Sequence, residues 1–275
     1  MKGFRRVFNF YINSSIHVSL AVVSLSWISL LEFDVSRDNN VLLFIFFASI
    51  TGYNFVKYFG LAKFHHRGLA DWLKFIQVFS FFCFVAMCVY AFEIQVKTLY
   101  YIVGFAIVTF LYAIPFLPKR FFLDEKHNLR NIGGLKIYVI ALVWAGVTVF
   151  LPIINNNVPI SEDVIITAIQ RFVFVIILML PFEIRDLQFD SIRLSTVPQK
   201  IGERWTKIIG TMLLALFYLM EFLKAEANSK KGIVLLITMI TFASLMGAKK
   251  QQGKYYSAFW VEGIPILWLL MVLLF

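Results

Sequence analysis

An acidic cluster that could hold a metal ion closes one of the apolar segments of this 275-residue chain. Glu183, Asp186 and Asp190 follow one another at intervals of three and four residues, so on a helix their carboxylates share one face. Oxygen ligands at this spacing suit Mg²⁺, which binds one or two carboxylates and completes its shell with water and phosphate oxygens. A plainer interpretation is a solvated helix end whose acids are neutralised by Arg185 and Arg193. Taken alone, these residues leave both interpretations open.

The elements that must position this cluster are membrane helices. Apolar residues make up 60% of the chain and charged residues 15%, whereas an ordinary soluble domain has about 45–50% apolar residues. This composition excludes a soluble enzyme, a disordered tail protein and a secreted disulfide scaffold. Inside a bilayer the backbone must satisfy its own hydrogen bonds, so each long apolar run is expected to be a helix. We therefore predict an all-α, polytopic membrane protein, a single domain over 1–275 with nine transmembrane helices at roughly 13–31, 41–62, 72–92, 97–117, 133–153, 163–185, 204–223, 232–248 and 255–275.

The formal net charge of +10 would suggest nucleic acid as the partner of a soluble protein. Here most Lys and Arg residues lie in short loops between apolar runs, where they meet lipid headgroups or a phosphorylated lipid. We expect no nucleic acid as a partner. If the N-terminus is cytoplasmic, most of these residues fall on the inner side, as the positive-inside rule requires. The sequence thus predicts a multi-pass protein of the cytoplasmic membrane, with its C-terminus outside.

Two further stretches resemble a known family when they are taken together with the acidic cluster. After Asp190 the chain continues through Thr196, Pro198 and Gly202, and between the fourth and fifth apolar runs it carries Tyr112, Pro115, Lys119 and Arg120. With these elements the chain resembles the UbiA superfamily of intramembrane prenyltransferases. That family has nine helices and a D-x-x-x-D motif at the cytoplasmic end of helix six, which Asp186 and Asp190 match. The resemblance spans nearly the whole chain.

The resemblance implies transfer of an isoprenyl group from its diphosphate to a membrane-soluble acceptor such as an aromatic ring. In such enzymes Mg²⁺ is held by aspartate motifs and stabilises the departing diphosphate. Carried onto this chain, the resemblance makes Asp186 and Asp190 the catalytic residues and, together with Glu183, the Mg²⁺ ligands. The residues that it implies for contact with the diphosphate are Arg185, Lys57, Asn54, Lys119 and Arg120.

The first aspartate motif of the family is degenerate here. Asn54 is retained, but Phe55, Tyr58 and Ala62 stand at its three acidic positions, and the segment holds no carboxylate. Lys57 could supply the positive charge that a second metal otherwise gives, since lysine is a competent phosphate ligand. Alternatively, the protein is a non-catalytic relative that keeps a lipid-binding or assembly role. A membrane transporter is a third possibility.

Two charged residues fall inside apolar runs and need a partner. Arg171 lies within the sixth run and Glu262 within the ninth. A charge at this depth costs about 2.5–3.5 kcal/mol on insertion scales, so such residues pair or mark a functional pathway. We expect Arg171 and Glu262 to pair with each other.

Overall fold

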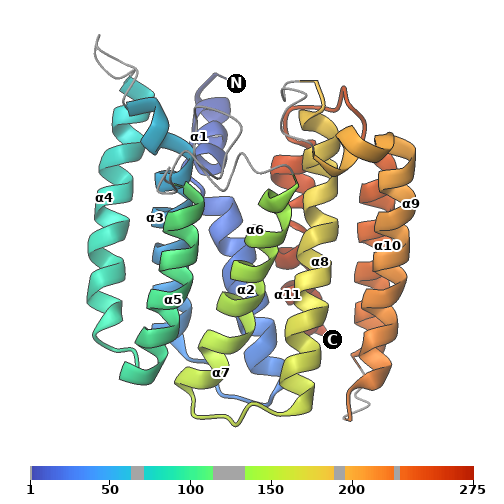
Figure 1. Cartoon of the computed structure of the whole chain (residues 1–275). Coiled ribbons are helices and arrows are strands. Elements are labelled where there is room, and N and C mark those ends of the chain that lie inside the picture. Colours follow the sequence, from blue (N-terminus) through green and yellow to red (C-terminus); the bar gives the residue numbers. More distant parts are fainter. Residues whose placement is uncertain (1, 63–70, 114–133, 189–195, 226–229) are drawn as a thin grey trace, which may run out of the picture.

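The computed structural model describes residues 2–62, 71–113, 134–188, 196–225 and 230–275. Within these ranges the chain is helical and contains no strand, so the prediction of an all-α protein is confirmed (Figure 1). The α-helices are α1 (Lys2–Asn13), α2 (Ile16–Glu32), α3 (Asn39–Ala62), α4 (Asp71–Ala91), α5 (Val96–Ala113), α6 (Leu135–Ala145), α7 (Leu151–Asn155), α8 (Glu162–Asp186), α9 (Val197–Met220), α10 (Lys231–Gly247) and α11 (Ile264–Leu274). A π-helical turn, η3 (Gly146–Phe150), joins α6 to α7, and another, η6 (Tyr256–Val261), precedes α11.

Six helical segments in these ranges are long and apolar enough to cross a membrane, by length and composition: Asn39–Tyr58, Trp72–Ala91, Leu135–Asn155, Glu162–Asp186, Val197–Leu223 and Tyr256–Leu274. The pair α1 and α2 makes a seventh if it is one broken span, because the two helices are bent by 52°. Two other predicted runs correspond to the shorter apolar helices Val96–Leu111 and Lys231–Gly247. Six or seven spans are thus supported in the described residues, and nine remains a prediction.

The ends of α8 follow from local chemistry. Ser161 caps its first turn, where the side-chain oxygen accepts a hydrogen bond from the Val164 N–H at 3.4 Å. Glu162 and Asp163 lie in the first turn and Arg185 in the last, which places each charge at the end of the helix dipole that favours it. The apolar residues between them make the span. The predicted run 163–185 therefore agrees closely with the observed helix.

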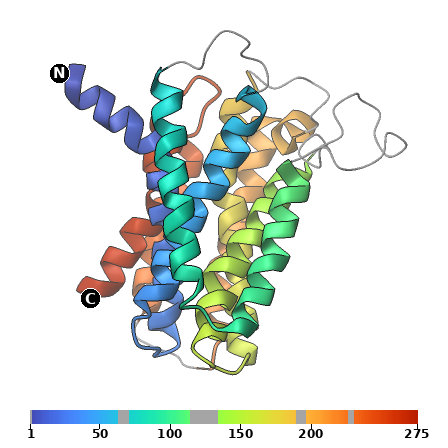
Figure 2. The ribbon, with the colours of Figure 1, turned by 90° about the vertical axis from the view of Figure 1, so that its left-hand side faces the viewer.

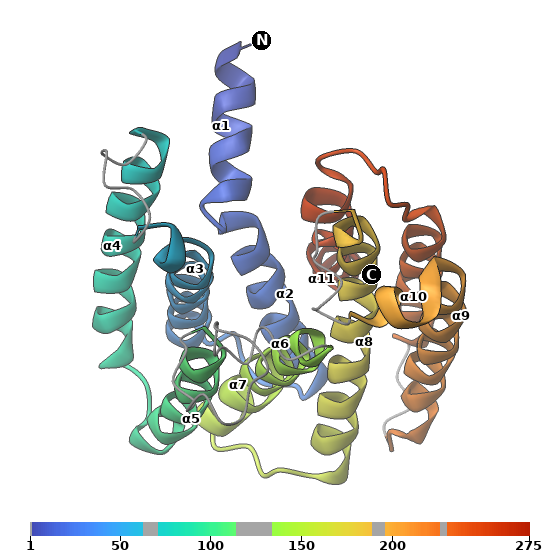
Figure 3. The same cartoon turned by 45° about the horizontal axis from the view of Figure 1, so that its top comes forward.

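With the end that carries the N-terminus tilted towards the viewer, α3 to α7 lie on one side of the bundle, α8 to α11 lie on the other, and α2 lies between them (Figure 3). Helix α2 packs against α3 and α11, α6 packs against α8, and α8, α9, α10 and α11 follow one another side by side. We call the end where α3 and α8 finish and α6 and α9 begin the site end, and the opposite end the far end. Helix α1 points outward from the site end (Figure 2).

The buried core of the bundle joins α8, α9 and α11 through three aromatic rings. Phe174 stacks on Phe217 with ring centroids 5.0 Å apart. The edge of Trp268 meets both rings, at 5.3 and 5.9 Å. All three side chains are buried, and the geometry is the one that aromatic quadrupoles prefer. This core holds the helix that carries the acidic cluster at a fixed position.

Candidate functional site

The acidic cluster at the end of α8 meets a lysine from α6. Lys136 Nζ lies 3.1 Å from Glu183 Oε1 and 3.8 Å from Asp186 Oδ2. The Glu183 side chain is only 2% exposed, and that of Asp186 is 19% exposed. Lys136 is not among the site residues predicted from the sequence. Its position two residues after Gly134, at the start of an apolar run, is the signal that could have identified it.

Arg185 turns back onto its neighbour in the chain. Its Nη2 and Nε atoms lie 2.7 and 2.8 Å from the same oxygen of Asp186, and its guanidinium carbon lies 5.4 Å from the centre of the Phe182 ring. Asp186 is therefore neutralised from two sides, by Arg185 and by Lys136. We call Lys136, Glu183, Arg185 and Asp186 the α8 cluster.

The described carboxylates of the α8 cluster do not make a metal site as they stand. The Lys136 ammonium already lies between Glu183 and Asp186. Within the residues that the structure describes, no group of three His, Cys, Asp or Glu side chains is close enough to hold a metal ion. Asp190, the remaining predicted ligand, lies outside the described residues. Mg²⁺ at Glu183, Asp186 and Asp190 therefore stays a prediction.

Asn54 holds the break between α1 and α2. Its Nδ2 donates to the Ser14 carbonyl at 3.0 Å and to Ser80 Oγ at 2.7 Å, while its Oδ1 accepts from Ser15 Oγ at 2.8 Å. Ser15 has a φ of 64°, in the left-handed region, which ends α1 and redirects the chain. The buried amide of Asn54 thus uses its donors and acceptor on the protein itself, so Asn54 positions the helices around the site.

Replacing Asn54 with leucine is expected to lower the free energy of unfolding by about 1–3 kcal/mol, because Ser14 and Ser15 lose their partner in a buried environment. The change is measured as the loss of thermal or denaturant stability in detergent. Asn40→Leu is the control, since Asn40 is exposed at the start of α3. Equal stability of the two variants would show that the hydrogen bonds of Asn54 do not stabilise the break between α1 and α2.

Lys57 lies one turn further along α3 and is exposed. Its Nζ donates to Ser15 Oγ at 2.8 Å and lies 6.0 Å from the centre of the Tyr53 ring. An ammonium group has three N–H donors, so the contact with Ser15 orients Lys57 without using all of its donor capacity. Of the other predicted diphosphate contacts, Lys119 and Arg120 lie outside the described residues.

Glu262 follows η6 and lies at the same end of the bundle. The charges that act on it are those of Lys57 on α3 and Arg185 on α8. Both of these residues were predicted from the sequence to contact the diphosphate. This finding corrects the expected pairing of Glu262 with Arg171. Arg171 lies 15 residues before Asp186 on α8, which at 1.5 Å per residue is about 22 Å towards the far end. Arg171 and Glu262 therefore lie near opposite ends of the bundle and do not meet.

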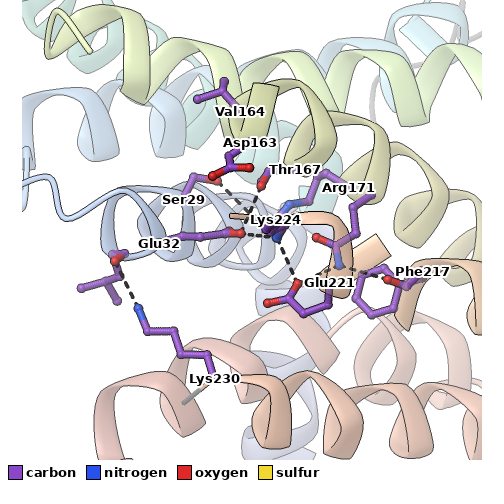
Figure 4. A network of polar contacts seen from close by, with 12 residues as sticks. Ser29, Glu32, Asp163, Val164, Thr167, Arg171, Phe217, Glu221, Lys224 and Lys230 are labelled. Carbon is purple, nitrogen blue, oxygen red and sulfur yellow. Dashed lines mark hydrogen bonds and ion pairs between the residues drawn. The ribbon is translucent and has the colours of Figure 1, made fainter. Parts of the chain in front are cut away.

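The real surroundings of Arg171 are a polar network at the far end (Figure 4). Its Nη2 donates to Ser29 Oγ at 3.4 Å, and its guanidinium lies 5.0 Å from the centre of the Trp268 ring. Glu32 and Glu221 are its acidic neighbours. We call Glu32, Thr167, Gln170, Arg171, Glu221 and Lys224 the far-end network.

Lys224 joins the two acids of the far-end network. It forms an ion pair with Glu32 and another with Glu221, the latter at 3.0 Å. Gln170 also donates to Glu221, at 3.0 Å, and Thr167 donates to Glu32 at 3.1 Å. The network links α2, α8 and the end of α9, so it stabilises the bundle away from the candidate site.

The stretch after the acidic cluster begins α9. Thr196 precedes the helix, and its N–H donates to Gln199 Oε1 at 3.0 Å. Pro198 occupies the first turn, where a missing N–H costs no helical hydrogen bond. Gly202 has a φ of 79° and interrupts the helix, a conformation that glycine adopts without strain. These three residues therefore bend the start of α9 beside the end of α8.

Comparisons with known proteins find a similarity in fold but none in sequence. No family model matches the chain, and no curated protein matches its sequence. A solved structure described as a digeranylgeranylglyceryl phosphate synthase in membranes matches with a TM-score of 0.57 over 97% of this chain and 98% of that one, at 14% identity. At this identity the likeness concerns the fold alone. The chain therefore shares its overall fold with that synthase.

Proposed function

We propose that this protein is a UbiA-like prenyltransferase, which transfers an isoprenyl group from an isoprenyl diphosphate to a membrane-soluble acceptor. The observation that carries the proposal is the group of cations at the site end: Lys57 on α3, Lys136 on α6 and Arg185 on α8. They lie at one end of an apolar bundle with a prenyltransferase fold. An isoprenyl diphosphate matches this arrangement, because its long apolar tail fits between the helices and its anionic head fits beside the cations.

The cations at the site end have a direct role in the proposed reaction. Negative charge develops on the diphosphate as it leaves, and cations already in position lower the barrier to its departure. Arg185 and Lys57 are the proposed diphosphate contacts, with Lys119 and Arg120 on the segment outside the described residues. Asp186 orients Arg185 at 2.7 Å. Aromatic faces such as that of Tyr53 can shield the electron-deficient carbon of the tail.

Mg²⁺ remains part of the proposal as a prediction, with Asp186 and Asp190 as its ligands and Glu183 beside them. When bound, it would supply further positive charge to the diphosphate. We also propose that the site end faces the cytoplasm, because the segment described there between α10 and η6 carries Lys249, Lys250 and Lys254. The acceptor is aromatic or, as in the product named for the structural neighbour, a glyceryl phosphate lipid.

The test is turnover by the purified protein in lipid nanodiscs with labelled geranylgeranyl diphosphate. Aromatic acceptors and geranylgeranylglyceryl phosphate are offered in turn, with Mg²⁺ and with EDTA. We expect an alkylated acceptor and released diphosphate. Failure to bind the donor under every condition would contradict the proposal.

Arg185→Met is expected to weaken donor binding and to lower turnover by about tenfold or more, because a charge-assisted contact to phosphate is worth about 1.5–3 kcal/mol. Donor binding is measured by titration with a non-reactive isoprenyl thiodiphosphate. Arg204→Met is the matched control, since Arg204 is exposed on α9. Equal binding by both variants would remove Arg185 from the site.

A non-catalytic, lipid-binding relative is the second candidate. The position of Lys136 between Glu183 and Asp186 favours it, because this lysine occupies the place where a metal would join the two carboxylates. Donor binding without turnover on any acceptor would support this candidate over the enzyme. Donor-independent, ion-driven uptake in proteoliposomes would instead support a transporter.

A further inference from the structure

Glu262 stands apart from the other acids of the site end. Glu183 and Asp186 are engaged by Lys136 and Arg185, and Glu203 pairs with Lys207 at 2.9 Å. Among the described residues Glu262 has no ion pair within 4 Å, although the charges of Lys57 and Arg185 act on it. A carboxylate inside a membrane helix is costly, and such a residue is a candidate for function.

The backbone around Glu262 is built to hold it in this position. It directly follows the π-helical turn η6, and such turns occur frequently at functional sites because the additional residue redirects the side chains that follow. His17 Nε2 donates to the Phe259 carbonyl at 2.9 Å, which fixes this turn to α2. A Cβ at Gly263 would lie 2.7 Å from the same carbonyl oxygen and 3.3 Å from His17 Nε2, so only glycine allows this approach.

The histidine contact also has a defined direction. A carbonyl oxygen only accepts, so Nε2 of neutral His17 carries the proton, and Nδ1 accepts from the Tyr11 hydroxyl at 2.8 Å. Gln252 fixes the other side of η6: its Nε2 donates to the Pro181 carbonyl of α8 at 3.3 Å and to the Ser257 hydroxyl. The turn before Glu262 is thus attached to both α2 and α8.

We propose that Glu262 is a catalytic base, whose carboxylate takes the proton that the acceptor loses when it is alkylated. This assignment rests on the proposed prenyl-transfer function and adds the residue that completes it. The hydrogen bonds of η6 place Glu262 near both cations: His17 lies two residues after Ser15, the partner of Lys57, and Pro181 lies one turn before Arg185 on α8. An acceptor attacking the donor carbon beside these cations would come next to the Glu262 carboxylate.

The step balances without a further reactant. The bond between the donor carbon and the diphosphate oxygen breaks, and its electron pair leaves with the diphosphate. A bond forms between that carbon and a ring carbon or hydroxyl oxygen of the acceptor, and the proton of that atom passes to Glu262.

The test compares Glu262→Gln with the wild type in nanodiscs, by donor titration and by turnover with phenolic acceptors of graded acidity. Because positioned bases contribute about 10²–10⁴-fold, we expect kcat to fall by that factor while the Kd of isoprenyl thiodiphosphate changes by less than about threefold. The loss should be greatest for the least acidic acceptor. Glu262→Asp should recover part of the rate, and Glu203→Gln, the matched control, should keep it.

The outcomes separate this assignment from the proposed function. An active wild type with an equally active Glu262→Gln variant would show that Glu262 is not the base, while the proposed prenyltransferase function would still hold. A rate loss that is uniform across the acceptors and accompanied by weaker donor binding or lower thermal stability would also overturn it, in favour of a structural role. A wild type that does not turn over any acceptor would overturn both.

Discussion

Replacing Lys136 with methionine is expected to lower the free energy of unfolding by about 3–5 kcal/mol, the cost of removing one partner of a buried ion pair. The loss comes from Glu183, which is 2% exposed and would keep its charge without the ammonium 3.1 Å away. Asp186 would lose less, because Arg185 remains on it. The measurement is denaturant or thermal unfolding of the purified protein in detergent.

The double variant Lys136→Met with Glu183→Leu separates the effect of the unpaired charge from the effect of altered packing. It should recover most of the stability, because replacing a buried ion pair by apolar side chains is often neutral. Lys250→Met is the control, since Lys250 is exposed between α10 and η6. A single variant as stable as this control, or a double variant less stable than the single one, would show that Lys136 does not neutralise Glu183.

Replacing Arg171 with methionine is expected to lower the free energy of unfolding by about 3 kcal/mol. Arg171 is 2% exposed, and its charge acts on Glu32 and Glu221, which would then share Lys224 alone. Leaving buried charge uncompensated is the costly part of such a change, and the contact with the Trp268 ring is lost as well. Unfolding in detergent measures the effect.

A charge-neutralising second change should rescue this loss. Arg171→Met with Glu221→Gln restores the charge balance of the far-end network, so we expect it to be more stable than Arg171→Met alone. Glu262→Gln offers the comparison, because Glu262 lies at the other end of the bundle and should give no rescue. Rescue by Glu262→Gln and not by Glu221→Gln would show that Arg171 pairs with Glu262 after all, against the structure.

Several features of this protein could be read from its residues. The long apolar runs determined the all-α membrane class, and the run 163–185 predicted α8 to within a residue at each end. The spacing of Glu183 and Asp186 placed both carboxylates on one helical face, where they share Lys136. Such features are local, since helical periodicity and capping depend on residues a few positions apart.

The partners of these residues were decided by the tertiary structure. Lys136 pairs with Glu183, which lies 47 positions later in the sequence. Asn54 binds Ser14 and Ser15 at a break between helices that no sequence motif predicted. Arg171 has Glu32 and Glu221 as its acidic neighbours instead of Glu262. In a soluble protein, the apolar stripe of a helix indicates which face packs inward. Helices that are apolar all round, as in a membrane, carry little such information, because lipid and protein neighbours are equally apolar. The sequence therefore determined which residues are charged and which helix carries them, and packing decided which of them meet.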